Sequence, residues 1–300
     1  MSETAILSRA RKRGRARLRA PFVLAVIPAV AIVLLVIGLP FIQTLQLTLS
    51  EWSGTGPVTP VGLDNFRQAL NSPEFFATLG RTAVFSLTST AGIVVIGTLL
   101  ATAIHAEIPG WEYFRILWFL PVVVPVSAAG VYWGAALQPS TGVANRFIEM
   151  ITGNQIPFLS DPQLVVITLA AVWIWIHTGF AMLIILGAMN SVPVEVYEAA
   201  RVDGATAVRR FFSMTLPIIR PSIVTVILLE LVITFNGFAI VWSMTRGGPG
   251  NASQIVAVDV YRTAFEQGQY GLASTIAVLG GIALAVVAIL SLRGMRSSSE

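Results

Sequence analysis

The chain alternates between long apolar runs and shorter polar stretches. Each apolar run is close to the roughly 20 residues that a helix needs to cross a bilayer. The six runs lie at about residues 22–45, 82–106, 116–137, 164–189, 218–244 and 272–292. The pattern therefore predicts an all-α, polytopic membrane protein with six transmembrane helices.

Two of these runs contain prolines, which remove a backbone donor from a helix. Pro28 and Pro40 interrupt the first run, and Pro121 and Pro125 lie inside the third. Membrane helices tolerate proline where neighbouring helices or water satisfy the freed carbonyl groups. We therefore expect each of the two runs to form one span.

The composition agrees with a membrane protein and excludes several kinds of chemistry. Hydrophobic residues make up 55% of the 300 residues and charged residues 11%, against about 25% charged residues in soluble domains. The chain has no cysteine, and its two histidines, His105 and His177, lack metal-ligand spacing. Its one lysine, Lys12, lies in no glycine-rich phosphate-binding loop. Any nucleotide that drives this protein must therefore be bound by another chain.

Seven basic residues lie within residues 1–20. Such a run can contact nucleic acid or anionic lipid, but directly before a span it is more typical of a signal that retains this end in the cytoplasm. A cleaved signal peptide is disfavoured because the following apolar run is too long and lacks a convincing cleavage site.

The distribution of all basic residues supports this orientation. With the N-terminus inside, the inner side carries 14 Lys and Arg residues and the outer side 5. Basic residues concentrate on the cytoplasmic side of membrane proteins. We therefore expect both termini and the polar segment 195–217 to be cytoplasmic.

The outer segments carry their own local signals. Residues 63–70 are amphipathic and predict a short surface helix, and residues 138–162 are polar with turn residues. A cluster of helix-breaking residues at 245–250 precedes a predicted helix at 258–265. Asp259 and Glu266 on this side are candidates for contact with a partner, although solvated charge is the favoured interpretation.

Segment 195–217 is the most polar long stretch after the basic N-terminus. Residues 198–201 have high helix propensity, and Gly204 accepts the left-handed conformation that ends a helix. Residues 206–213 can form a second short helix, and Pro217 suits the first turn of the next span. The segment predicts a bent pair of helices on the membrane surface.

Glu198-Ala199-Ala200, Gly204 and Leu216-Pro217 occur here at a characteristic spacing. The segment resembles the EAA loop of binding-protein-dependent ABC importer permeases, and Met214 departs from the isoleucine usual there. In that family the loop is the coupling helix that docks into a cleft of the ATPase. The resemblance assigns coupling to Glu198, Ala199, Ala200, Asp203, Gly204, Leu216 and Pro217. The alternative is an amphipathic interfacial helix between two spans.

The resemblance covers nearly the whole chain, including a Gly-Leu-Asp-Asn-Phe run at 62–66, and is closest to carbohydrate permeases. It implies a type I ABC importer fold with a basic N-terminus at 1–20, a first helix at 21–48 and a permease core at 76–293. It also implies a bacterial plasma-membrane complex with a second homologous permease, two copies of a cytoplasmic ATPase and a solute-binding protein. In this arrangement the chain is not an enzyme, because ATP and Mg are bound by the ATPase.

Glu230 lies deep in the fifth run, where a lipid-facing carboxylate costs roughly 2.5–3.5 kcal/mol. It should therefore face the bundle or a watery path. Thr234 and Gly237 share its helical face, and Asn236 lies one step around. These groups match the hydroxyls of a sugar, and a hydrogen-bonded clamp between helices is the equal alternative.

Trp173, His177 and Phe180 recur at i, i+4 and i+7 in the fourth run. Aromatic rings can stack on a sugar ring while the histidine binds a hydroxyl group. The alternative is that these residues only pack between helices. A pocket between the fourth and fifth spans is the resulting hypothesis.

The sequence leaves two other classes of protein as alternatives. A proton-coupled secondary transporter could use Glu230, but no inverted repeat is apparent. A membrane enzyme lacks support because no paired carboxylates or nucleophile–base pair occur at useful spacing. The charged inner segment with His105, Glu107, Glu112 and Arg115 is assigned no chemistry.

Overall fold

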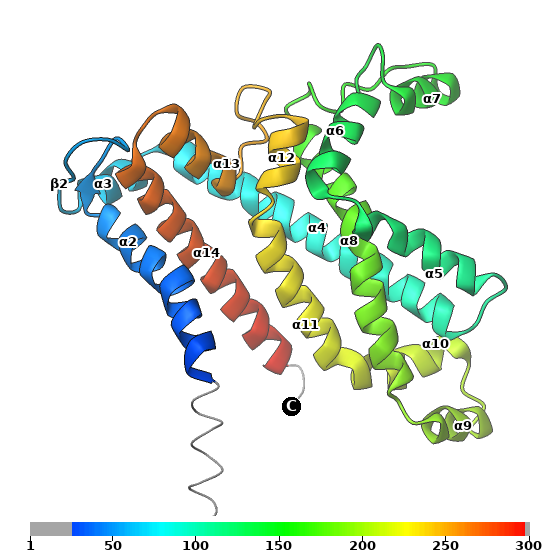
Figure 1. The fold of residues 1–300 in the computed structure, drawn as a ribbon. Coiled ribbons are helices and arrows are strands. Elements are labelled where there is room, and N and C mark those ends of the chain that lie inside the picture. The colour runs from blue at the N-terminus through cyan, green and yellow to red at the C-terminus, as the bar shows by residue number, and fades with distance from the viewer. Residues whose placement is uncertain (1–25, 298–300) are drawn as a thin grey trace, which may run out of the picture.

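The computed structural model describes residues 26–297, so the basic N-terminal segment 1–20 lies outside the described residues. The described chain is a bundle of long, tilted helices with short helices at both ends (Figure 1). The all-α prediction is confirmed, with one small addition. Strands β1 (Ser50–Glu51) and β2 (Thr59–Pro60) form a short antiparallel hairpin in which Ser50 pairs with Pro60.

Five helices in the described chain are long and apolar enough to cross a membrane, or six if one bent pair counts as a single span. The first candidate, Val26–Leu47, contains the π-helical turn η1 (Leu34–Gly38) and α2 (Leu39–Leu47). The fourth and last predicted spans correspond to α8 (Val165–Asn190) and α14 (Tyr270–Ser297). These three positions agree with the apolar pattern to within a few residues.

The second span begins earlier than its apolar run. Helix α4 (Pro73–His105) starts nine residues before the predicted boundary at Thr82. The Ser72 hydroxyl accepts a hydrogen bond from the N–H of Phe75, and Pro73 occupies the first turn. Both features favour a helix start. The extra turns carry Glu74 and Arg81 among apolar residues and extend beyond the apolar run.

The third predicted span is sharply bent, and it counts as one span only if its two helices are taken together. The segment forms α5 (Trp111–Phe119), a 3₁₀ turn η2 (Leu120–Val123) and α6 (Val126–Ala136), with a bend of 99° between the two parts. Pro121 lies in the turn and Pro125 precedes α6. Each proline removes a backbone donor, and Val124, directly before Pro125, adopts an extended conformation with φ of −76° and ψ of 128°. Two prolines four residues apart therefore break the helix rather than kink it.

The fifth predicted span is also divided differently. Helices α10 (Ala207–Arg210), η3 (Phe211–Thr215) and α11 (Leu216–Phe235) form one continuous helix, Ala207–Phe235. The predicted short helix at 206–213 is therefore the start of the span, and Pro217 lies inside the continuous helix. The π-helical turn η3 directly precedes the proline, and η3 closes with the Leu216 N–H donating to the Phe211 carbonyl.

The same predicted span ends too late. Helix α11 stops at Phe235, and a separate helix α12 (Phe238–Met244) follows after Asn236 and Gly237. Glycine is a weak helix former and asparagine favours caps. The break therefore divides the apolar run into a long and a short helix.

One end of the bundle collects most of the short elements (Figure 1). They are the β1–β2 hairpin, α3 (Asp64–Leu70), α7 (Val143–Thr152), α12, α13 (Val256–Tyr261) and η4 (Arg262–Glu266). The predicted surface helix at 63–70 is confirmed by α3, and the predicted helix at 258–265 by α13 and η4. The other end carries α9 (Val194–Val202), α10 and the end of α14 (Figure 1).

The main core lies where α4 and α8 cross. Phe85 and Ile93 from α4 and Met182 and Ile185 from α8 belong to one hydrophobic cluster, and all four are fully buried. Helix α5 also approaches α8 closely at Gly179, where an added Cβ would contact the Trp118 carbonyl oxygen. Small residues at membrane helix interfaces permit such approaches. These contacts hold α8 in place, and α8 carries half of the candidate site.

Substitution of Gly179 by alanine should lower the melting temperature of the purified protein by several degrees. The new methyl group meets the α5 backbone, and overpacking costs about 1–3 kcal/mol. Gly187→Ala on the same helix is the matched control, because nothing lies within 4 Å of its added Cβ. Equal melting temperatures for the two variants would contradict the close α5–α8 contact.

Candidate functional site

A bent pair of helices projects from one end of the bundle, as the polar segment predicts. We call residues 194–210 the foot. Helix α9 ends at a Schellman motif: Ala205 N–H donates to the Ala200 carbonyl and Gly204 N–H to the Arg201 carbonyl. Gly204 has φ of 71°, which explains the glycine. The Thr206 hydroxyl then accepts from Arg209 N–H and starts α10.

The coupling candidates do not all lie on the surface of the foot. Glu198, Ala199, Asp203, Gly204 and Pro217 are exposed, and Leu216 is half-buried. Ala200 is instead the buried residue of α9. Its small side chain lies against its own chain, so its assignment to coupling stays a prediction from the resemblance.

The foot is attached to the ends of two long helices. The Tyr197 ring of α9 lies 5.5 Å from the His105 ring at the end of α4, and His105 Nδ1 lies 2.9 Å from Asn190 Oδ1 at the end of α8. His105, to which the sequence analysis assigned no chemistry, therefore has a structural role. These contacts connect α9 to the end of α4, and the end of α4 to the end of α8.

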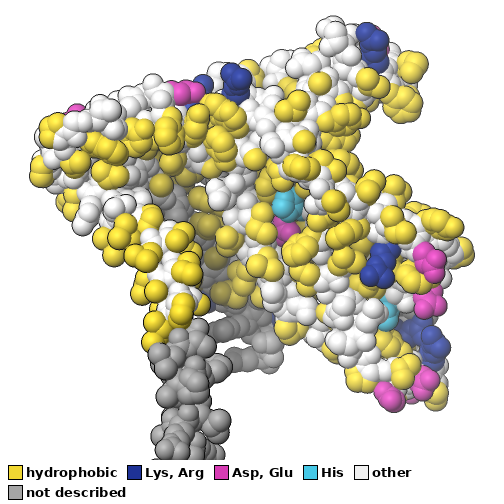
Figure 2. All heavy atoms as spheres, in the orientation of Figure 1, with side chains coloured by type: hydrophobic (Ala, Val, Ile, Leu, Met, Phe, Trp, Pro, Cys, Tyr) yellow, Lys and Arg dark blue, Asp and Glu magenta, His cyan; other side chains and the backbone are white. Residues whose placement is uncertain are grey.

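Apolar side chains on the foot and just after it have no cover in the described chain. Val202 is 88% exposed, and Val194, Val208 and Phe212 are each more than half exposed. Charged side chains surround them, and Figure 2 shows dark blue and magenta side chains gathered over the corner formed by α5, α9 and α10. Exposed apolar groups rimmed by polar ones mark interaction surfaces.

Helices α8 and α11 meet through a group of polar and aromatic side chains. Trp173 Nε1 donates a 2.9 Å hydrogen bond to Thr234 Oγ1, and the Trp173 ring stacks on His177 with centroids 4.3 Å apart. His177 Nδ1 lies 3.4 Å from Glu230 Oε2. The structure thus brings together Trp173, His177, Glu230 and Thr234, four of the seven pathway candidates.

Glu230 is the most unusual member of this group. Its side chain is fully buried, and neither carboxylate oxygen has a hydrogen-bond partner in the described chain. His177 Nε2 is also without a partner there, although the His177 side chain is 15% exposed. Buried polar atoms are nearly always hydrogen-bonded. Glu230 and His177 therefore have unused hydrogen-bonding capacity in the described chain, in addition to the contacts that join α8 to α11.

Three pathway candidates do not join this group. The Phe180 side chain is 40% exposed despite its matching helical spacing, and Asn236 is also exposed at the end of α11. Gly237 leaves no gap, because an added Cβ would lie 2.8 Å from Phe85 Cε1. The Phe85 ring of α4 also packs edge-on against Trp173, at 5.8 Å between centroids. Sequence reasoning missed Phe85 because an apolar residue in an apolar run carries no local signal.

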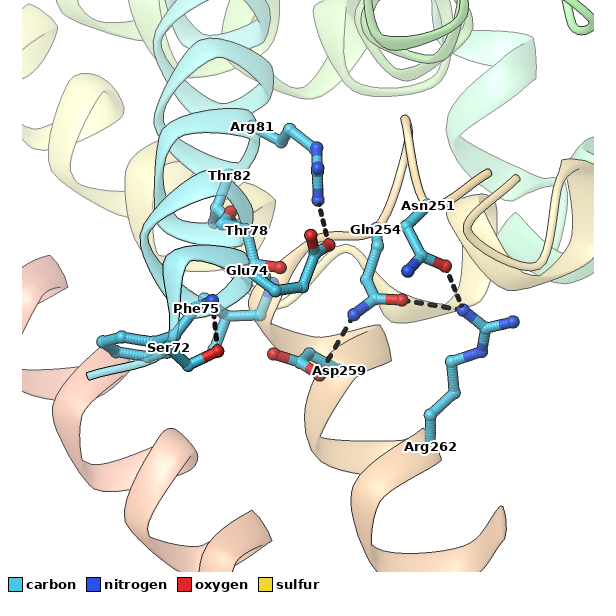
Figure 3. Close-up of polar contacts among 11 residues, drawn as sticks. Ser72, Glu74, Phe75, Thr78, Arg81, Thr82, Asn251, Gln254, Asp259 and Arg262 are labelled. Atoms are coloured by element: carbon cyan, nitrogen blue, oxygen red, sulfur yellow. Dashed lines mark hydrogen bonds and ion pairs between the residues drawn. The ribbon is translucent and has the colours of Figure 1, made fainter. Parts of the chain in front are cut away.

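A second polar cluster lies at the opposite end of the bundle, between the start of α4 and α13 (Figure 3). Gln254 Nε2 donates to Asp259 Oδ1 at 3.0 Å, and Arg262 Nη1 donates to Gln254 at 2.7 Å and to Asn251 at 2.8 Å. These side chains border a cavity of about 430 Å³. The cluster ties the loop before α13 to α13 and η4.

Asp259 is not the solvated charge that the sequence suggested. Its burial, reinforced by the negative charge of Glu74, raises its pKa from 3.8 to about 6. Glu74 itself pairs with Arg81 at 2.8 Å. Glu266 is exposed and forms an ion pair with Arg262 at 3.4 Å. The signal was missed because Glu74 and Asp259 are brought together only by the fold.

Replacing Thr234 with valine should reduce stability by about 1–3 kcal/mol, the cost of leaving the buried indole N–H of Trp173 without an acceptor. Chemical denaturation of the purified protein measures this change. Thr225→Val on the same helix is the control, since the Thr225 hydroxyl donates only to the Pro221 carbonyl of its own turn. An equal loss of stability in both variants would mean that the hydrogen bond between Trp173 and Thr234 contributes no more than one within a single helix.

The raised pKa of Asp259 predicts a pH-dependent stability. The native state binds the proton of Asp259 more tightly than the unfolded chain, so the stability that this proton contributes is complete below pH 3.8 and is lost as the pH rises through about 6. Melting temperatures between pH 5 and 7.5 should fall by a few degrees in the wild type and by less in Asp259→Asn. The same substitution at the exposed Asp64 should leave the wild-type slope in place. A wild-type slope in Asp259→Asn would refute the assignment.

Known proteins resemble this chain over most of its length. Residues 5–297 match the family described as binding-protein-dependent transport system inner membrane component. The trehalose/maltose permease MalF of Thermococcus litoralis is 27% identical over 85% of this chain and 87% of its own length. The sulfoquinovosyl glycerol permease SmoG of Agrobacterium fabrum is 29% identical over 86% and 84%.

A solved structure supports the fold. One chain of a bacterial ABC transporter that imports the acidic polysaccharide alginate superposes with a TM-score of 0.82, at 21% identity, covering 97% of this chain and 100% of its own. The secondary-transporter alternative receives no support from these matches. With its multi-pass bundle and its foot, the chain belongs to the inner membrane components of binding-protein-dependent transport systems, the permease subunits of ABC importers.

Proposed function

We propose that this chain forms half of the import pathway for a carbohydrate, and that the foot couples this pathway to a cytoplasmic ATPase. The observation that carries the proposal is the continuous helix Ala207–Phe235. It begins in the foot and contains Glu230 and Thr234 of the buried polar group. At 1.5 Å per residue, its 29 residues span about 43 Å.

The surface of the foot suits a protein partner. Exposed Val202 and Val208 supply apolar area, while Glu198 and Arg201 are exposed on α9. In the related importers that the EAA segment resembles, the glutamate of the motif pairs with basic groups in the ATPase cleft, which here implies Glu198. ATP and Mg are bound by two copies of that ATPase, so this chain needs no cofactor and performs no catalysis.

The orientation follows from the same assignment. Facing the ATPase places the foot and both termini in the cytoplasm, in agreement with the excess of basic residues on that side. The opposite end, with α3, α7 and α13, then faces the solute-binding protein. The exposed apolar faces of the described helices suit lipid and a second, homologous permease, which completes the pathway in a bacterial plasma membrane.

The chemistry of the buried group suits a carbohydrate. The carboxylate of Glu230 can accept hydrogen bonds from hydroxyl groups, and the imidazole of His177 can accept or donate them. The aromatic rings of the group can pack against the apolar face of a sugar. The permeases of the trehalose/maltose and multiple sugar-binding systems are relatives of this chain. Nucleic acid has no place in this proposal.

In proteoliposomes with all subunits, uptake of a labelled sugar should require ATP and the solute-binding protein. Glu198→Ala should reduce this uptake about tenfold or more, since charge-paired interface residues cost roughly 2–5 kcal/mol when truncated. Glu195→Ala, in the first turn of the same helix, is the matched control. Uptake driven by a proton gradient without ATP would refute the proposed function, and equal effects of both substitutions would refute the role of Glu198.

A further inference from the structure

The buried carboxylate of Glu230 carries information about the charge of the solute. Both of its oxygens lack a hydrogen-bond partner in the described chain, and the side chain is fully buried. A carboxylate in such surroundings is stabilised by donors and destabilised by any second negative charge. This inference rests on the proposed function, because it concerns the solute that passes this group.

On the described helices that form this group, α4, α8 and the helix of Glu230 itself, no arginine or lysine is seen to pair with Glu230. Helix α8 has neither residue type. Along the continuous helix that carries Glu230, the nearest is Arg220, ten residues earlier and about 15 Å away along the axis. On α4, Arg81 pairs with Glu74 at the far end of the bundle. In the part of the chain that the structure describes, His177 is the one ion-pair partner recorded for Glu230.

His177 does not turn the site into an anion site. Its Nδ1 faces Glu230, so any positive charge on the ring is balanced by this carboxylate. Its stacking on Trp173 restrains the ring, and its Nε2 remains without a partner. Together the two side chains present a carboxylate with two accepting oxygens and one imidazole nitrogen. This set favours a ligand with several O–H donors and no negative charge.

We propose that Glu230 sets the charge preference of this pathway, accepting hydrogen bonds from uncharged polyhydroxyl solutes and excluding sugars that carry a carboxylate. The alginate importer that shares this fold handles an acidic polysaccharide, so the fold itself does not impose the preference. Glu230 is thus a specificity-determining residue of this chain. A solute carboxylate within a few ångströms of Glu230 is repelled by its negative charge, which lowers the binding affinity of that solute about tenfold or more.

The test measures binding to the assembled permease–ATPase complex without its solute-binding protein, so that the selectivity of that protein is removed. Saturation-transfer NMR with glucose, maltose and glucuronate gives the apparent affinity of each sugar. The wild type should bind a neutral sugar about tenfold or more tightly than glucuronate. Glu230→Gln should raise the relative affinity for glucuronate about tenfold or more and change that for the neutral sugars by only a few-fold.

Glu149→Gln on α7 is the matched control, since it removes a carboxylate outside the long helices, and it should keep the wild-type ratio. Glutamine is isosteric with glutamate and less costly to bury, so the Glu230 variant should fold. Equal binding of glucuronate and neutral sugars by the wild type, or an unchanged ratio in Glu230→Gln, overturns the inference alone. No binding of any sugar, together with no ATP-driven uptake, overturns the proposed function as well.

Discussion

The continuity of one helix determines how this molecule can work. Ala207–Phe235 runs without a break from the foot to the buried group at α8. Pro221 inside this helix removes one backbone donor, but the helix continues past it, so the foot and the buried group belong to the same helical element. A π-helical turn precedes Pro217, and the helix continues past this proline to Phe235. Without this continuity, the foot and the buried group would be independent features.

The low dielectric of the bundle gives the other end of this helix its chemistry. In water, the interactions of Glu230 with its surroundings would be weak, but inside a packed bundle they are several-fold stronger. The hydrogen bond from Trp173 to Thr234 and the stacked His177 hold the group in place. The group can therefore both hold the two helices together and contact a solute. Trp173 and Thr234 hydrogen-bond to each other, whereas Glu230 and His177 keep unused hydrogen-bonding capacity.

Much of the fold could be predicted from the sequence because spanning a bilayer requires a long apolar run. The positions of α8 and α14 and the bent foot at Gly204 followed from apolar length and glycine chemistry. The 99° bend at Pro121 and Pro125 did not. A proline can kink a helix, end it or lie within a helix that continues past it, and packing of the neighbouring helices decides between these outcomes.

The candidate site was predictable only up to the choice of helix face. Helical spacing correctly grouped Trp173 with His177 and Glu230 with Thr234. It also included Phe180, which is exposed, because the sequence does not reveal how much of a helix its neighbours cover. The burial of Ala200 and the contact of Phe85 with Gly237 depend on approaches between segments distant in sequence. The repulsion between Glu74 and Asp259 likewise arises only because the fold brings these distant residues together.

Transmission through the rigid helix can be measured directly, because the chain contains no cysteine and accepts spin labels at single introduced cysteines. Val208 and Val232 are exposed on the continuous helix and about 36 Å apart; Ile289 on α14 is an exposed reference. Electron-spin distances in the assembled complex should show a constant Val208–Val232 separation with and without ATP, while both distances to Ile289 change. A changed Val208–Val232 distance with Val232 fixed relative to Ile289 would contradict the account.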